Sequence, residues 1–382
     1  MTFSAPRLAI LLALFSSAVS AAQIPDPPTL DAKSYALLDY ASGQLIAGRD
    51  ADLRVEPASI TKVLTIYVAL DELKQGRIHL DDQVLISEKA WRQGKDSSES
   101  RMFIEVGKRV KFDDLLRGIV IQSGNDATVA VSEHIAGSEE VFAQLMNQYA
   151  KKLGLRNSHF ADASGMPNPE HYTTAHDLVL LGRALVRDFP EAYKIFSERQ
   201  FFFNGIKQQN RNMLLDMDPS VDGIKTGHTD AAGFCLLSSA SRDGRRLIAA
   251  LMGSRGTTQR ARDSKALLDY GFRFYETAQM FGPAQPVSSL RAWKGAEELL
   301  PVGTAQPLAL ALPRGSQQQL QFTQQINGPV IAPVDAGQAV GTLNVMLEGK
   351  LIRSEPLVAL KAIPEGSLFR RALDTIRMWW AS

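Results

Sequence analysis

Cysteine is nearly absent from this sequence: Cys235 is the single thiol among 382 residues, which excludes a disulfide within the chain. Its surroundings, GFCLLSSA, are typical of a buried strand, so we expect an inert core residue there. Net charge is also lacking, since 42 lysines and arginines are matched by 41 aspartates and glutamates without a basic cluster. Such a chain has no field that would attract a nucleic acid, and we expect no such partner.

The chain also lacks a membrane-spanning run near its start. Its apolar stretch Leu8–Phe15 is well short of the roughly 20 residues that cross a bilayer as a helix. Arg7 precedes this stretch and small residues follow it, which is the pattern of a secretory signal. We assign residues 1–22 to a signal peptide, cleaved after residue 20, 21 or 22, and expect an exported protein. A signal anchor retained in the membrane is the alternative.

Composition predicts a folded protein with more than one domain, because 45% of the residues are hydrophobic and no low-complexity run occurs. In residues 27–282, two apolar runs, Tyr35–Asp39 and Leu45–Ala47, flank the turn sequence YASG and predict a hairpin. Helical periodicity follows, strands dominate from about Gln200, and a helix, RARDSKALLDYGFRFYETA, closes the unit. Strands at both ends of a helical middle predict one α/β domain whose sheet pairs its termini.

The C-terminal third has a different sequence pattern. After a linker, MFGPAQPVSSL, residues 287–361 alternate or run apolar over strand lengths and predict a small all-β domain. Residues 365–382 have a helical pattern with an apolar stripe that includes Phe369, Ile376 and Trp380. This helix could dock on the β domain. Paired tryptophans with interleaved arginines favour instead an amphipathic helix that lies in the lipid headgroup layer and anchors the protein.

The stretch PASITKVLT places Ser59 and Lys62 three residues apart, on one face of the predicted first turn of a helix. A serine hydroxyl is a poor nucleophile at neutral pH and needs a base within hydrogen-bond reach. A lysine can be that base only when it is neutral, which requires desolvation and a second cation nearby. By itself the pair is weak evidence, because one such match is expected by chance in a chain of this size.

Two later motifs strengthen the catalytic interpretation of this pair. IQSGNDA contains Ser123 and Asn125 after an apolar helical run, and VDGIKTGHTD contains Lys225, Thr226 and Gly227 on a predicted strand. Lys225 is the obvious second cation. Ser123 can relay a proton toward a leaving group, and the Asn125 amide can order the lysines and hold a substrate amide.

Residues around the third motif suggest how a substrate would be held. A glycine at position 227 allows a backbone to approach closely, as beside an extended peptide. The backbone N–H groups of Ser59 and His228 would form an oxyanion hole, and the His228 ring is expected to be partly exposed. Arg211 could pair with a substrate carboxylate, although a surface arginine on a loop is an equally good interpretation.

One stretch, NPEHYTTAHDL, contains residues that can bind metals: Glu170, His171, His176 and Asp177. It lacks the H-E-x-x-H pattern and no further ligands cluster near it, so we expect no metal. Thr174 as an N-cap and Asp177 in the first turn explain its end as the start of a helix. We expect no cofactor of any kind.

Together EPASITKVLT, QSGNDATVAV, NGIKQQNRNMLL and SVDGIKTGHTDAAGF resemble the D-alanyl-D-alanine carboxypeptidases, the low-molecular-mass penicillin-binding proteins of the type numbered five and six. The resemblance covers nearly the whole chain. It implies a transpeptidase-like α/β fold, with an antiparallel sheet flanked by helices and a helical subdomain, followed by a small β domain and an amphipathic C-terminal helix. It maps Ser59 to the acylated nucleophile, Lys62 to its base, Ser123 and Asn125 to the second motif, Lys225, Thr226 and Gly227 to the third, and Arg211 and His228 to carboxylate recognition.

The activity implied by this resemblance is that of a serine DD-peptidase, which removes the terminal D-Ala from peptidoglycan pentapeptides. It also implies covalent binding of β-lactams and a place at the periplasmic face of the bacterial inner membrane, where the C-terminal helix would bind the lipid surface.

Three alternatives remain. A class A β-lactamase uses Ser-Asp-Asn where this chain has Ser-Gly-Asn, and the candidate for its water-activating glutamate, Glu170, lacks the usual sequence setting. A DD-endopeptidase would cut cross-links with the same machinery. A penicillin-binding module that serves cell shape with little turnover would not need the intact Ser59, Lys62 and Lys225.

Overall fold

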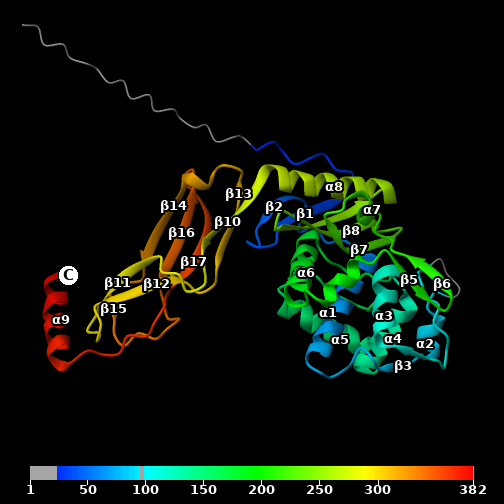
Figure 1. Ribbon diagram of the computed structural model, residues 1–382, viewed down its shortest axis with the longest axis horizontal. Coiled ribbons are helices and arrows are strands. Elements are labelled where there is room, and N and C mark those ends of the chain that lie inside the picture. Colours follow the sequence, from blue (N-terminus) through cyan, green and yellow to red (C-terminus); the bar gives the residue numbers. More distant parts are fainter. Residues whose placement is uncertain (1–23, 95–98, 382) are drawn as a thin grey trace, which may run out of the picture.

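The computed structural model describes residues 24–94 and 99–381, and its α/β part and β-rich part lie next to each other along the long axis (Figure 1). The predicted signal peptide, residues 1–22, lies outside the described residues. The helices of the α/β part are α1 (Lys62–Lys74), α2 (Glu88–Arg92), α3 (Phe112–Arg117), α4 (Asn125–Ala136), α5 (Glu139–Lys152), α6 (Ala175–Asp188), α7 (Leu214–Met217) and α8 (Thr257–Phe274). Its strands are β1 (Ser34–Asp39), β2 (Leu45–Arg49), β3 (Gln83–Leu85), β4 (Arg109–Lys111), β5 (Gln200–Phe203), β6 (Ile206–Gln209), β7 (Val221–Thr229), β8 (Gly233–Arg242) and β9 (Arg245–Ser254).

The main sheet pairs the two ends of the α/β part. Its strands follow the order β2-β1-β9-β8-β7, and each is antiparallel to its neighbours. The predicted hairpin forms β1 and β2, and β1 also pairs along its whole length with β9. The prediction that the sheet joins the termini of this domain is therefore confirmed.

Helices cover both faces of this sheet. Ala36 and Leu38 of β1 belong to the larger core with residues of α1 and α6, whereas Leu37 belongs to a second core with residues of α8. Because successive side chains of a strand point to opposite faces, a strand between two helical layers is buried on both faces. Every residue of β1 is buried, including the polar Ser34 and Asp39 at its ends. The α/β architecture with flanking helices and an α1–α5 helical subdomain is as predicted.

The predicted last helix of this part is too long by four residues. Helix α8 ends at Phe274, and Tyr275 begins strand β10 (Tyr275–Phe281), which pairs antiparallel with β13 (Leu308–Pro313). The backbone hydrogen bonds offered by β13 outweigh the local helical pattern, which is a tertiary effect that no short window can reveal. The predicted linker is accordingly shorter, since its first two residues belong to β10 and its last three to β11 (Ser288–Trp293).

The β-rich part is built on a sheet with the order β14-β16-β17-β12-β11-β15. Its strands, besides β11, are β12 (Leu299–Thr304), β14 (Leu320–Ile326), β15 (Val330–Ile331), β16 (Ala339–Leu347) and β17 (Lys350–Ala359). The predicted apolar runs appear as strands β13, β14, β16 and β17. The division into domains at residues 27–282 and 287–361 stays a prediction, and the pairing of β10 with β13 argues for a boundary near Phe274.

The terminal helix α9 (Leu368–Ala381) lies at the end of the β-rich part that is remote from the α/β part (Figure 1). It contacts the β-rich part through a polar residue: buried Asp374 accepts a hydrogen bond of 2.7 Å from the backbone N–H of Lys294. Its apolar stripe is turned away and exposed, including Leu368, Phe369, Ile376, Trp379 and Trp380. No helix among the described residues is long and apolar enough to span a membrane.

Replacing Asp374 with alanine should loosen α9 without affecting the α/β part. The change leaves the N–H of the half-buried Lys294 without its acceptor, at a cost of about 1 kcal/mol. We expect faster amide exchange throughout α9 in hydrogen-exchange mass spectrometry. Thr375→Ala, at an exposed neighbouring position, is the control and should leave exchange unchanged. Equal exchange in Asp374→Ala and the native protein would contradict this docking contact.

Candidate active site

Ser59 lies in a 3-10 turn that leads directly into α1. The predicted helix from Pro57 is thus two elements: the turn Ala58–Thr61 and then α1, which begins at Lys62. Ala58 has a positive φ of 48°, which directs the chain sharply into the turn. The Nζ atom of Lys62 lies 3.0 Å from Ser59 Oγ. The predicted pairing of the serine with the lysine side chain is therefore present in the structure.

Lys62 is completely buried, and its amine has two oxygen partners. Besides Ser59 Oγ, it donates a hydrogen bond of 2.7 Å to the backbone carbonyl of Ser164. Burial lowers the pKa of Lys62 to about 7, although the nearby carboxylates of Asp162 and Glu99 oppose the shift. A substantial fraction of Lys62 is therefore neutral at neutral pH, as a general base requires.

Lys225 on β7 is also buried and lies in a positive environment. Burial lowers the pKa of Lys225 well below its usual value, and the charges of Lys62, Arg211 and Arg260 lower it further. Its Nζ donates to the carbonyl of Thr226 at 3.2 Å. The charge of Lys62 thus disfavours a proton on Lys225, whereas the cation that lowers the pKa of Lys62 itself is Arg211.

Ser123 and Asn125 lie at the junction between two helical segments. A single π-helical turn, Gly118–Gln122, follows α3, and Ser123 then has a left-handed backbone with φ of 66°. Asn125 opens α4, and its amide donates a hydrogen bond of 2.8 Å to the carboxylate of Glu99. Both Ser123 and Asn125 are almost fully buried.

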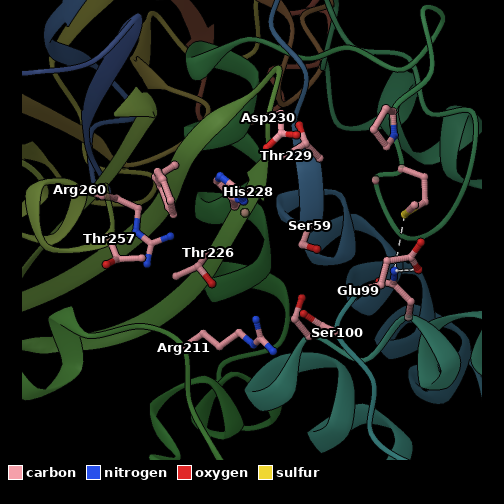
Figure 2. A pocket seen from close by; sticks show the side chains of 17 residues that line it. Ser59, Glu99, Ser100, Arg211, Thr226, His228, Thr229, Asp230, Thr257 and Arg260 are labelled. Carbon is pink, nitrogen blue, oxygen red and sulfur yellow. Dashed lines mark hydrogen bonds between the residues drawn. The ribbon is translucent and has the colours of Figure 1, made fainter. Parts of the chain in front are cut away.

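These motifs converge on one cleft of about 620 Å³. Figure 2 shows Thr226 and His228 of β7 across from Ser100 and Glu99, with Ser59 between them. Seven of the predicted residues line the cleft: Ser59, Ser123, Asn125, Arg211, Thr226, Gly227 and His228. Lys62 and Lys225 are buried behind the lining and contact the lining residues Ser59 and Thr226, respectively.

Gly227 is required by packing within the protein. A Cβ atom at this position would lie 2.9 Å from the carbonyl oxygen of Pro57 and 3.2 Å from Ala58 Cβ. We expected Gly227 to allow a peptide substrate to approach the backbone closely. In the structure, the segment that approaches Gly227 is the turn that contains Ser59. The next residue, His228, is exposed as predicted, and its ring stacks on Phe234 with centroids 4.0 Å apart.

A second guanidinium, which the sequence did not reveal, lines the same cleft. Arg260 of α8 is almost fully buried, and its Nε has no hydrogen-bond partner within the described part of the chain. Burial lowers the pKa of Arg260 to about 10, so it remains a cation at neutral pH. With exposed Arg211, it gives the cleft two positive groups on the side of β7 and α8 (Figure 2). No local pattern marks Arg260, because only the packing of α8 on the sheet brings it to the cleft.

The residues first considered as metal ligands are separated by the fold. His171 is buried, and His176 pairs with Asp52 at the surface. Thr174 is the N-cap of α6, as predicted, and its hydroxyl oxygen accepts a hydrogen bond from the backbone N–H of Asp177. Nowhere in residues 24–94 and 99–381 do three His, Cys, Asp or Glu side chains gather as a metal site would require. Glu170 is exposed, and the carboxylates that line the described cleft are instead Glu99 and Asp230.

Cys235 is buried in β8, as expected of a core residue. Burial raises the pKa of its thiol to about 11, so almost no reactive thiolate exists at neutral pH.

The chain matches two protein-family models. Residues 21–256 match the model for D-alanyl-D-alanine carboxypeptidases of the peptidase S11 family, and residues 275–365 match the C-terminal domain of penicillin-binding protein 5. D-alanyl-D-alanine carboxypeptidase DacA of Escherichia coli K12 is 42% identical over 385 residues, which cover 97% of this chain and 96% of that protein.

Solved structures agree with this assignment. Penicillin-binding protein 5 of Haemophilus influenzae superimposes with a TM-score of 0.86 at 38% identity, covering 89% of this chain and 100% of that one. Penicillin-binding protein D2 of Listeria monocytogenes, solved in a cefotaxime-bound form, has a TM-score of 0.60 at 27% identity and covers 65% of this chain and 100% of that one. The chain belongs to the peptidase S11 family, and it is a serine D-alanyl-D-alanine carboxypeptidase of the penicillin-binding protein 5 and 6 type.

Proposed function

We propose that Ser59 is the nucleophile of this carboxypeptidase and Lys62 its general base. The observation that carries the proposal is the contact between Lys62 Nζ and Ser59 Oγ at 3.0 Å, made by an amine that burial keeps close to neutrality. In the first step, Ser59 Oγ attacks the carbonyl carbon of the D-Ala-D-Ala amide while its proton passes to Nζ. The developing oxyanion would accept hydrogen bonds from the backbone N–H groups of Ser59 and His228.

The second step returns the proton and releases the terminal D-alanine. Ser123 would relay the proton from Lys62 to the leaving nitrogen, and Asn125 would hold the amide that precedes the cut. The C–N bond breaks, an ester forms on Ser59, and a water molecule then hydrolyses this ester to regenerate the serine. A β-lactam would acylate the same oxygen, as the bound form of the Listeria relative suggests.

We assign the terminal carboxylate of the substrate to the positive side of the cleft. Arg211 and Arg260 line it, together with the hydroxyl of Thr226. A carboxylate placed there also stabilises a proton on Lys225, whose other close charges are cations. This arrangement favours substrates with a free C-terminus, which supports trimming of peptidoglycan pentapeptides over cutting of internal cross-links.

The exposed stripe of α9 supports peripheral attachment to a lipid surface. Six large apolar side chains of α9 are exposed, and the polar side of the helix holds it to the β-rich part through Asp374. We propose that the stripe enters the headgroup layer at the periplasmic face of the bacterial inner membrane. The catalytic cleft would then be displaced from the lipid by the length of the β-rich part (Figure 1).

Ser59→Ala should abolish acylation while the protein remains folded, because the change removes the oxygen that Lys62 Nζ contacts. The native protein should release D-Ala from diacetyl-L-Lys-D-Ala-D-Ala and gain the mass of one benzylpenicillin on the peptide that contains Ser59. Mass spectrometry of both proteins checks this. Rapid penicillin hydrolysis without release of D-Ala would indicate a β-lactamase, and a stable adduct without release would favour the endopeptidase or binding-module alternatives.

The rate of acylation should depend on the protonation of Lys62. With a pKa of about 7, the neutral base is lost as the pH falls, so the second-order rate constant should drop about tenfold per unit below pH 7. Lys62→Ala should lower it by about 100-fold or more at neutral pH. Stopped-flow measurements with benzylpenicillin test both points, and Lys194→Ala, at an exposed position, is the control. A near-native rate in Lys62→Ala would exclude this base.

Deleting residues 368–382 should release the protein from lipid without loss of activity on soluble peptides. Co-sedimentation with vesicles that contain anionic phospholipids measures the first effect, and D-Ala release measures the second. Thr375→Ala should still sediment, since this residue lies outside the apolar stripe. Sedimentation of the truncated protein at the native level would disprove the anchor.

A further inference from the structure

A short loop between α5 and α6 contacts the buried amine of Lys62. This loop, residues 162–166, is called here the clamp loop. Its Ser164 carbonyl accepts from Lys62 Nζ at 2.7 Å, and the neighbouring Ala163 carbonyl accepts from Thr65 Oγ1 at 2.7 Å. Gly165 has a φ of 87°, and a Cβ atom there would lie 1.8 Å from the carbonyl oxygen of Ala58. The loop therefore packs directly against the Ser59 turn.

A single carboxylate organises the clamp loop. Asp162 Oδ1 accepts hydrogen bonds from the backbone N–H groups of Ser164 at 2.7 Å, Gly165 at 2.6 Å and Met166 at 3.4 Å. Burial raises the pKa of Asp162, but its hydrogen bond and charge interaction with His171 and these backbone donors outweigh burial, so the pKa lies below its usual value. Asp162 is thus an anion that fixes the direction of the Ser164 carbonyl.

A buried histidine in turn holds Asp162. His171 Nδ1 lies 3.3 Å from Asp162 Oδ2, and Nε2 lies 2.9 Å from the hydroxyl of Thr61, the residue before Lys62. The ring is 2% exposed and packs against the ring of Phe160. The same Nδ1 accepts a hydrogen bond of 3.3 Å from the backbone N–H of Ala161, so the ring joins the start of the clamp loop to Thr61. The chain of contacts from Lys62 through Ser164, Asp162 and His171 to Thr61 closes on itself.

This closed chain explains how the amine of Lys62 is aimed. A neutral amine has one lone pair, and it can accept the Ser59 proton only when its N–H bonds point elsewhere. The Ser164 carbonyl takes one of these N–H bonds, and so orients the lone pair toward the cleft. A shift of this carbonyl by about 1 Å would misdirect the base, and such displacements can cost about 100-fold in rate.

We propose that Asp162 and His171 are a positioning pair for the general base: they hold the Ser164 carbonyl against Lys62 Nζ and keep one negative charge beside that amine. The inference rests on the proposed role of Lys62 as base. Neither residue touches the described cleft, so both act through Lys62.

The charge of Asp162 gives this pair a measurable signature. Lys62 faces the carboxylates of Asp162, Glu99 and Asp126 on one hand and the cations Arg211 and Lys225 on the other. His171 faces Asp162 and the neutral Thr61. Removing the negative charge of Asp162 makes protonation of Lys62 less favourable, so the base stays neutral to a lower pH. A purely structural defect would lower the rate at every pH without this displacement.

The test is the pH dependence of acylation by benzylpenicillin in the full chain. Asp162→Asn retains an oxygen for the backbone donors, and we expect its acidic limb to move to lower pH by about half a unit or more. His171→Ala should lower the plateau by about tenfold, and His171→Gln, which can still bond Thr61, should recover most of it. The controls are Asp52→Asn and His176→Gln, which alter the surface Asp–His pair and should leave the profile unchanged.

An acidic limb of Asp162→Asn that superimposes on the native one would overturn the proposal, as would a native plateau in His171→Ala. If His171→Ala fails to fold by circular dichroism, the Asp162→Asn profile decides alone. Lys62→Ala separates the two levels of the argument. A rapid rate in that variant would refute the base itself, whereas a lost rate together with an unshifted Asp162→Asn profile would refute only the positioning pair.

Discussion

The burial of one lysine amine is the constraint on which the rest of this structure depends. Moving a charged ammonium out of water costs several kcal/mol, and the least costly response of the protein is to lower its pKa. Lys62 has the core of the helical subdomain around its aliphatic stem and two oxygen acceptors at its tip. The same desolvation that would destabilise a charged lysine therefore produces a base near neutrality, beside the hydroxyl that it must deprotonate.

The surrounding charges act on the pKa of Lys62 in both directions. Carboxylates at Glu99, Asp126 and Asp162 favour a proton on Lys62, and burial together with Arg211 opposes it. Lys225 has the opposite arrangement, since its neighbours are cations. A substrate carboxylate that binds near Arg211 and Arg260 would add negative charge on the side of Lys225. Arg211 thus takes part both in the proposed binding of the substrate carboxylate and in setting the pKa of Lys62 and Lys225.

The β-rich part and α9 show a separate physical solution. An amphipathic helix at the end of a chain normally buries its apolar side, but α9 docks through buried Asp374 and leaves its aromatic residues exposed. In this inverted arrangement the polar side has specific partners in the β-rich part, among them the backbone N–H of Lys294 and the guanidinium of Arg291. It leaves the apolar side available for a lipid surface.

The sequence by itself determined the features that depend on local spacing. The Ser59 and Lys62 pairing, the apolar runs that form the β1–β2 hairpin and the amphipathic pattern of α9 are visible motifs or short-range periodicities, and all three were predicted. Only the tertiary structure decided which distant groups complete the site. Arg260, Glu99, Asp162 and His171 carry no distinctive local pattern, and Tyr275–Phe281 became a strand because β13 offered its backbone. In each case the deciding energy is a contact between segments far apart in the chain, which local propensity cannot encode.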